Sequence, residues 1–212
     1  MTDSSLNNRP SDKGAPNSTL VGSKVESASP RKIQETFFKL NFGQVKGQLC
    51  LAFLSTSDKR EMMELWYSYP KDLDAALDDI ERYASDRHGY FCPQLFSRKE
   101  RKKEYVVATP NIWSDLDSCH PDKLLVEPSL VVESSPKRYQ AYWLLEGEVD
   151  PKDAEDISRR IHYYHANDGA DKSGWDLTQL LRIPGTFNFK YINTAHQSYP
   201  VVRFVKASKS YY

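Results

Sequence analysis

The pattern of apolar and polar positions predicts that the folded part of the chain begins near Pro30. Residues 1–29 contain hardly any large apolar side chain, so they cannot bury enough surface to offset the entropy of ordering and are expected to be disordered. The apolar spacing over residues 33–40 then predicts an opening helix. Residues 48–54 form an apolar run typical of a largely buried strand. The expected organisation is therefore a disordered tail, 1–29, followed by one domain, 30–212, that is large enough to be catalytic.

The next segments differ in period. Residues 61–68 alternate between two sets of side chains, a pattern that fits either a second strand or a short helix. Apolar residues three or four positions apart over 73–84 predict a helix with an acidic outer face, and Gly89 is expected to end it. Short strands are expected at residues 90–92 and 105–108.

The second half of the chain predicts a hairpin followed by a helix. Residues 130–133 and 139–145 are apolar runs joined by polar turn residues, which is typical of two paired strands. Asp150 and Pro151 are preferred at the N-cap and the first position of a helix. The buried stripe of that helix is expected to consist of four residues: Ala154, Ile157, Ile161 and Tyr164.

A tight turn and two strands are expected to complete the domain. Pro184 and Gly185 together favour a tight turn. Residues 186–191 are expected to leave that turn as a strand, and residues 201–205 to form the closing strand.

Asp115 and Asp117 are the chemical signal around which the rest is organised. They flank Leu116 at the end of an apolar, aromatic run, so a strand would place both carboxylates on one face. Carboxylates that close repel each other, and a hard divalent cation such as Mg2+ or Mn2+ removes the repulsion. Two surface acids on a strand end are the alternative, and for an isolated Asp-x-Asp the more common one. The pair is therefore a candidate metal site that needs a partner from elsewhere in the chain.

The densest basic cluster lies just before this strand. Its members Arg98, Arg101, Lys102 and Lys103 are expected to hold a nucleic-acid backbone if the loop lies at the edge of the acidic site. A solvated loop without a ligand is the alternative interpretation.

Charge and cysteine content exclude several classes of protein. Lys plus Arg and Asp plus Glu both total 29, so the net charge indicates no polyanionic partner. Three cysteines without close pairing argue against a disulfide framework. Cys119 and His120 lack a second pair at zinc-binding spacing, and His162 and His165 lack a third ligand, so no zinc site is expected.

No apolar run is long enough to cross a membrane and no signal peptide is evident, so a cytoplasmic location without a membrane partner is expected.

Three segments carry a resemblance to a known family. Residues 112–117, 134–143 and 175–190 resemble, in this order, the catalytic motifs of the archaeo-eukaryotic primase superfamily, most closely its plasmid and phage replication primases and primase-polymerases. The resemblance covers roughly residues 37–191, and the third motif is the most specific. It implies an α/β (α+β) fold with two lobes. An N-terminal αβ unit and a C-terminal lobe like an RNA-recognition-motif sheet would enclose the active site in the cleft between them.

The resemblance also implies the site residues. Asp115, Asp117 and Asp176 are implied to be the catalytic carboxylates and to hold two Mg2+ or Mn2+ ions. Five residues are implied to bind the incoming nucleoside triphosphate: Ser135, Arg138, Gln140, Arg182 and Lys190. Gln140 departs from the family, which commonly has histidine there, and a glutamine cannot supply a positive charge.

The implied function is that of a DNA primase-polymerase. Such a nucleotidyltransferase uses a single-stranded DNA template and nucleoside triphosphates to make or extend primers, and a downstream helicase or replication domain is an expected partner. The alternative is a catalytically inactive relative that binds single-stranded nucleic acid or nucleotides. The presence of all three carboxylates favours the enzyme. An unrelated metal phosphoesterase is disfavoured because no water-activating base accompanies the acidic pair.

Overall fold

The computed structural model describes residues 28–58, 60–190, 198–208 and 210–212. The predicted disordered tail lies outside these ranges except for its last two residues. Of these, Ser29 is the N-cap of the first helix, where its Oγ accepts a hydrogen bond from Lys32 N at 3.4 Å. Within the described residues the α-helices are α1 (Pro30–Phe42), α2 (Leu73–Tyr83) and α3 (Pro151–Tyr164).

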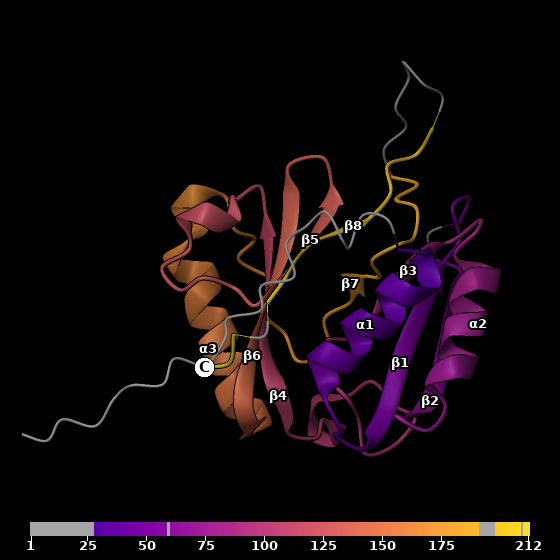
Figure 1. The fold of residues 1–212 in the computed structure, drawn as a ribbon, viewed down its shortest axis with the longest axis horizontal. Helices are drawn as coiled ribbons and strands as arrows, with labels where there is room; N and C mark the ends of the chain where they lie inside the picture. Colours follow the sequence, from indigo (N-terminus) through magenta and orange to yellow (C-terminus); the bar gives the residue numbers. More distant parts are fainter. Residues whose placement is uncertain (1–27, 59, 191–197, 209) are drawn as a thin grey trace, which may run out of the picture.

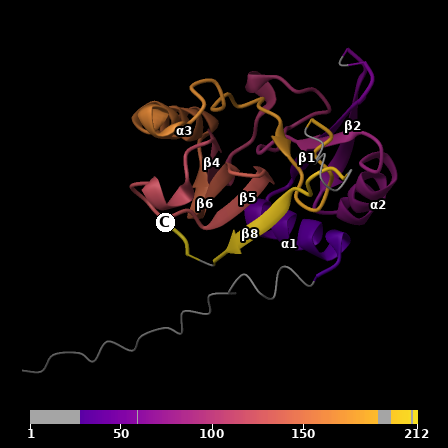
Figure 2. The ribbon, with the colours of Figure 1, turned by 90° about the horizontal axis from the view of Figure 1, so that it is seen from above.

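Two four-stranded antiparallel sheets form the body of the molecule, with strand orders β2-β1-β3-β7 and β4-β6-β5-β8 (Figure 1). The strands are β1 (Gly47–Leu54), β2 (Met62–Tyr69), β3 (His88–Phe91), β4 (Thr109–Asp117), β5 (Leu130–Ser135), β6 (Arg138–Val149), β7 (Leu181–Arg182) and β8 (Arg203–Ala207). Helices α2 and α3 lie on opposite flanks of the molecule in both views (Figures 1 and 2). The predicted α/β fold with two lobes is confirmed.

The first sheet decides the ambiguous segment at 61–68, and two further expectations near it are corrected. Residues 62–69 form β2, a strand paired along its whole length with β1. Gly89 does not end α2, which stops at Tyr83; it lies in β3 opposite Phe53, where a Cβ would come within 3.3 Å of Ala84. The strand expected at 105–108 is also wrong. Hydrogen bonds to the preceding loop, such as the one from Val107 N to the Leu95 carbonyl, hold these residues outside the sheet, and β4 begins only after them.

The second sheet contains the predicted hairpin, with β5 and β6 joined by a two-residue turn, Pro136–Lys137. The expected strand 186–191 is wrong for the residues that are described. Residues 186–188 make only one isolated bridge, between Phe187 and Val201, with backbone hydrogen bonds to residues 200–202, and the chain turns at 189–190, so no strand extends further. Tyr191 lies outside the described residues. The closing strand is β8, two residues later than expected.

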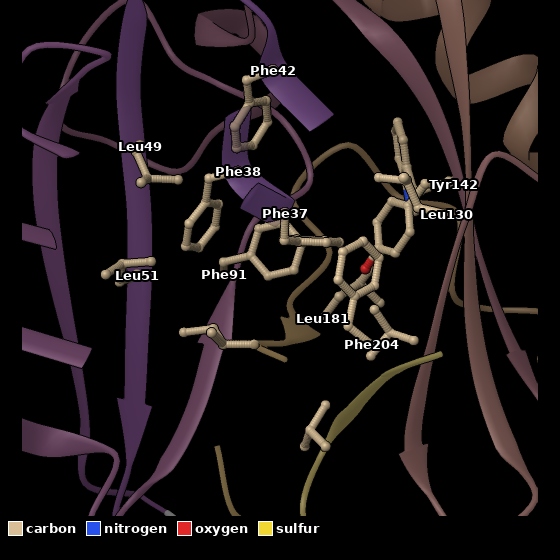
Figure 3. Close-up of a cluster of buried hydrophobic side chains, with 14 of the residues drawn as sticks. Phe37, Phe38, Phe42, Leu49, Leu51, Phe91, Leu130, Tyr142, Leu181 and Phe204 are labelled. Carbon is tan, nitrogen blue, oxygen red and sulfur yellow. The ribbon is translucent and has the colours of Figure 1, made fainter. Parts of the chain in front are cut away.

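Helix α1 packs between the two sheets and joins them into one core (Figure 3). The ring of Phe37 is fully buried and makes edge-on contacts with Phe91 of the first sheet and with Tyr142 and Phe204 of the second, at centroid distances of 5.2, 5.2 and 5.5 Å. Burial of such aromatic rings is a large stabilising term. The two sheets are therefore fixed relative to each other by this helix.

Helix α3 begins as predicted, with Asp150 accepting a hydrogen bond from Lys152 N at 2.9 Å, but it buries a different face. Ala154, Ser158 and His162 are the buried positions, whereas two members of the predicted stripe, Ile157 and Tyr164, are 40% and 66% exposed. Small side chains at 154 and 158 let the helix lie close against β4. None of the helices in the described ranges has the length and apolar character that crossing a membrane requires.

Candidate active site

The acidic pair lies at the end of β4, where the strand loses its regular register. Asp115 lies opposite Gln140 of β6, and the pairing shifts before Asp117, which lies opposite Tyr139. Asp117 has a φ of 46°, in the left-handed region that non-glycine residues rarely adopt. Register shifts and unusual backbone angles often occur where a strand presents side chains to a site.

One pocket brings together the acidic pair and all five predicted nucleotide-binding residues. Strands β4, β5 and β6 of the second sheet supply one side, β3 and β7 of the first sheet another, and residues 188–190 complete it. The predicted residues in its lining are Asp115, Asp117, Ser135, Arg138, Gln140, Arg182 and Lys190. Four further lining residues had no assigned role: Tyr90, Ser134, Leu180 and Asn188. Ser134, Leu180 and Asn188 lie within the motifs, whereas Tyr90 lies outside them and carried no sequence signal for the site.

Strand β7 explains how the third motif reaches this pocket. It pairs with β3, so Arg182 lies opposite Tyr90 in the first sheet although it follows the second sheet in sequence. The Arg182 guanidinium lies 4.7 Å from the centroid of the Tyr90 ring, and its Nη1 lies 3.1 Å from His88 Nδ1. Downstream, Asn188 donates from Nδ2 to the Ser134 carbonyl at 2.8 Å, which ties the turn to β5. The pocket therefore forms where β7 and the residues after it lie against β5 of the second sheet.

Opposite charges meet within the pocket. Arg138 forms an ion pair with Asp117 through Nη1 and Oδ1. Gln140 is nearly buried, and its Oε1 has no hydrogen-bond partner among the described residues. A pocket with two carboxylates and three cationic side chains suits a ligand that is itself polyanionic and carries bound cations.

The electrostatic surroundings of Asp115 favour the uncharged carboxyl. Burial first, and then the negative charges of Asp171 and Asp117, raise the pKa of Asp115 to about 7. Part of the side chain remains exposed, but protein surrounds it densely. Asp171 was not predicted from the sequence, since it belongs to a polar turn without a motif of its own.

His162 fixes the backbone of the acidic strand. Asp115 N donates to His162 Nε2 at 3.0 Å, and the other ring nitrogen donates to the Ser158 carbonyl at 2.7 Å. Burial lowers the pKa of His162, in keeping with this neutral tautomer. Gly174 completes the packing, because a Cβ there would lie 2.7 Å from Asp115 Cβ. His162 is therefore more than the ordinary helix histidine that was expected.

Asp176, the third predicted carboxylate, is not among the lining residues of the pocket. Its Oδ2 pairs with Lys103 Nζ at 2.7 Å, and its Oδ1 accepts hydrogen bonds from the amide and hydroxyl of Thr178. Although burial opposes the effect, the hydrogen bonds from Lys103 and Thr178 lower the pKa of Asp176. The structure thus brings Asp115 and Asp117 together and holds Asp176 beside the basic cluster.

The basic cluster is only partly a solvated loop. Arg101 pairs with Glu64 at 2.8 Å and donates to the Thr178 carbonyl at 2.6 Å, and Lys103 also pairs with Glu155 at 2.6 Å. These contacts hold the segment around Asp176. Arg98 lies over the ring of Tyr105, and Lys102 pairs with Glu100. Arg98 and Lys102 are the more exposed members, so they are the better placed for the predicted DNA contacts.

The two antiparallel sheets, with the acidic pocket between them, form the fold of an archaeo-eukaryotic primase domain, the class that the motifs indicated. The chain belongs to the family of the RepB DNA-primase N-terminal domain, whose model matches residues 89–212, more than half of the 212 residues.

Solved structures agree with this fold. The catalytic domain of primase RepB′ in complex with initiator DNA is 20% identical, with a TM-score of 0.63, over 87% of this chain and 88% of that one. The primase-polymerase domain of cyanophage S-2L is 13% identical, with a TM-score of 0.61, over 85% of this chain and 92% of that one. A longer RepB′ structure is 20% identical, with a TM-score of 0.65, over 86% of this chain. The chain spans 58% of the length of that protein. No curated protein matches the chain.

Proposed function

We propose that residues 30–212 form the catalytic domain of a DNA primase-polymerase, which joins nucleotides on a single-stranded DNA template during replication. The observation that carries this proposal is the pocket in which Asp115 and Asp117 face the cationic side chains of Arg138, Arg182 and Lys190. Membership of a DNA-primase family supports the reaction class. The similar RepB′ domain was solved with initiator DNA, which supports DNA as the template here.

The carboxylates suit hard divalent cations. Asp115 and Asp117 offer only oxygen ligands. Burial first, and then neighbouring negative charge, raise the pKa of Asp115, so a cation that replaces its proton would relieve the repulsion. We assign Mg2+ or Mn2+, two ions, to Asp115, Asp117 and Asp176. When bound, such ions supply Lewis-acid activation of the attacking hydroxyl and neutralise charge on the phosphates.

The remaining lining residues would bind and orient the nucleotide. Arg182 and Lys190 would neutralise the triphosphate, and Ser135 and Gln140 would hydrogen-bond it. Arg138 has a second role, because its guanidinium now neutralises Asp117. If Arg138 bound a phosphate, Asp117 would be released to bind a cation. If Asp117 bound a cation, Arg138 would be released to bind a phosphate. Nucleotide and metal affinities are therefore expected to be coupled.

The third carboxylate can be tested directly. Family resemblance assigns it to Asp176, whereas Asp171 is the acid with the larger electrostatic effect on Asp115. We retain Asp176 as the metal ligand and assign Asp171 an electrostatic effect only. Asp176→Asn should then abolish nucleotide transfer, and Asp171→Asn should leave most of it. The opposite result would transfer the ligand role to Asp171.

The decisive experiment measures primer extension and unprimed synthesis with Mg2+ or Mn2+, using either ribo- or deoxynucleotides. Asp115→Ala and Asp117→Ala should each reduce the rate by about 1000-fold or more, since the metal-holding carboxylates act in the transition state. The matched control is Asp74→Ala, an exposed acid on α2. Circular dichroism verifies folding.

The second candidate function is a catalytically inactive module that binds single-stranded nucleic acid or nucleotides. It would give no product from the wild type under any of these conditions while retaining binding. Product from the wild type that survives both Asp115→Ala and Asp117→Ala would instead place the chemistry outside the pocket.

A further inference from the structure

A second group of metal-ligating side chains lies outside the pocket. The potential ligand atoms of Cys119, His165 and Asp168 all lie within 4.8 Å of one another. Cys119 follows the end of β4, His165 is the C-cap of α3, and Asp168 ends the short helical turn after it. Cys119 lies far from His165 and Asp168 in sequence, so spacing did not connect the three, and the expectation of no zinc site paired Cys119 with His120 and His165 with His162.

We propose that Cys119, His165 and Asp168 form a structural site for a divalent cation of the zinc type. A sulfur, an imidazole nitrogen and a carboxylate oxygen are the three ligand kinds that Zn2+ accepts, with water able to take a fourth position. The all-oxygen pair at Asp115 and Asp117 suits harder ions instead. The two sites would therefore select different metals. This inference is independent of the proposed nucleotide transfer.

The backbone holds the ligands together before any ion binds. The amide and the hydroxyl of Ser118 both donate to the Gly169 carbonyl at 3.3 Å. Gly169 has a φ of 108°, and a Cβ there would come within 2.4 Å of Ser118 Oγ, so only glycine permits this approach. Cys119 and His165 are buried, at 0% and 4% exposure, while the Asp168 side chain is 39% exposed. Solvent can thus reach the group from the Asp168 side.

The present contacts of these side chains are weak enough to be exchanged. His165 Nδ1 lies 3.3 Å from Asp168 Oδ2, and Leu125 N donates to His165 Nε2 at 3.4 Å, both long for hydrogen bonds. Tetrahedral zinc with bonds of about 2.0–2.3 Å separates its ligand atoms by about 3.3–3.8 Å, so modest contraction suffices. Coordination breaks the Cys119 S–H bond, and its proton passes to water.

An ion at this position would brace the acidic end of the pocket. Cys119 lies two residues after Asp117, and Asp168 lies three residues before Asp171, whose charge acts on Asp115. The site would link these two segments across the gap between β4 and the end of α3, which lie side by side in Figure 1. We therefore expect zinc to stabilise the fold.

The test uses Co2+ as a spectroscopic probe on chelator-treated protein. Wild type should bind one equivalent with thiolate-to-cobalt charge-transfer absorption, which Zn2+ abolishes by displacement. Zn2+ at about 100 times its Kd should raise Tm by about 5 °C or more. Asp168→Asn and Cys119→Ser should each weaken binding by more than about tenfold. His120→Ala, a change of the exposed neighbouring histidine, is the matched control and should bind normally.

The proposal would be overturned by the absence of thiolate-to-cobalt absorption in the wild type, or by wild-type Zn2+ affinity in both Asp168→Asn and Cys119→Ser. Because Cys119 is buried, its variant is first checked for folding by circular dichroism; the exposed Asp168 keeps the test valid if that variant does not fold. The double variant Asp115→Asn, Asp117→Asn should retain the cobalt absorption. Its loss there would mean that Asp115 or Asp117 is a ligand of the same ion as the thiolate, and would also contradict the proposal.

Discussion

The two sheets have the same number of strands and the same antiparallel pairing, but they differ in regularity. In the first sheet β1 pairs with β2 over eight consecutive residue pairs and with β3 over four, without a shift in register. In the second sheet each of the three strand pairs contains at least one register shift. Two of these shifts, between Asp115 and Asp117 and between Glu133 and Ser135, lie at the pocket.

The difference in regularity matches a difference in role between the two sheets. The first sheet has a central strand that is buried along most of its length and contributes few side chains to the pocket. The second sheet departs from regular pairing at two places where it directs polar side chains into the pocket. Asp117 at one of them, and Lys137 in the turn between β5 and β6, have positive φ. Irregular pairing costs stability locally, so it is retained where a site requires it. The regular sheet and helix α1 provide the framework that tolerates that cost.

The largest expected effect on stability comes from separating the two sheets. Phe37→Ala removes a fully buried ring that contacts both of them, and should lower the free energy of unfolding by about 3–5 kcal/mol in urea denaturation. The control, Phe187→Ala, removes a ring that is 44% exposed and should cost much less. Equal losses would show that α1 does not join the sheets.

Asp115 should make the second sheet sensitive to pH. Its pKa in the folded protein, about 7, lies above the ordinary value of 3.8, so its stabilising contribution is complete below pH 3.8 and is lost as pH rises through 7. Without divalent ions, Asp115→Asn should therefore exceed the wild type at pH 8 by about 1–3 kcal/mol in free energy of unfolding, after allowance for partial exposure.

Urea denaturation in chelator at pH 4, 6 and 8 measures this difference, which should shrink towards pH 4. Asp74→Asn, at an exposed position on α2, should show no such pH-dependent gain. A gap between Asp115→Asn and the wild type that does not change with pH would contradict the proposed charge repulsion.

The exposed basic residues should act on the template and not on the nucleotide. Neutralising Arg98 and Lys102 should weaken single-stranded DNA binding by about tenfold at low salt and reduce the magnitude of the salt slope by about 1–1.5, as two lost phosphate contacts would. Nucleotide affinity should not change. Fluorescence anisotropy of labelled single-stranded DNA across a salt series measures the DNA affinity and its salt slope.

The matched control for this pair neutralises Lys46 and Lys71, two exposed lysines just before β1 and just after β2, with the same change in net charge. DNA binding equal to that of the Arg98 and Lys102 variant would mean that the effect comes from net charge alone. Binding equal to that of the wild type in both variants would assign the cluster to solvated surface.

The smallest expected effect is the relief of backbone strain in the second sheet. Lys137 has a φ of 64° in the turn between β5 and β6, a conformation that glycine adopts without strain. Lys137→Gly should therefore raise the free energy of unfolding by about 0.5–1 kcal/mol. Lys137→Ala, which keeps the strain, is the control, and an equal gain from both substitutions would contradict this explanation.

The sequence by itself determined the elements with a strong local signal. The acidic pair on a strand, the hairpin at residues 130–145 and the helix that begins at Asp150 all follow from alternation and capping, which act between near neighbours. The three motifs were also sufficient to indicate the primase class, and through it the five residues that meet with the acidic pair in one pocket. Their roles in the reaction remain predictions.

Only the tertiary structure decided which residues approach each other from distant segments. Strand β7 joins the first sheet, His162 hydrogen-bonds the backbone of Asp115, and Lys103 pairs with Asp176. Helix α3 buries Ser158 in place of Ile157 because a small side chain lets the helix approach β4, a requirement of the neighbour and not of the helix itself. Such contacts depend on the packing of segments far apart in the chain, and periodicity along the chain carries no information about them.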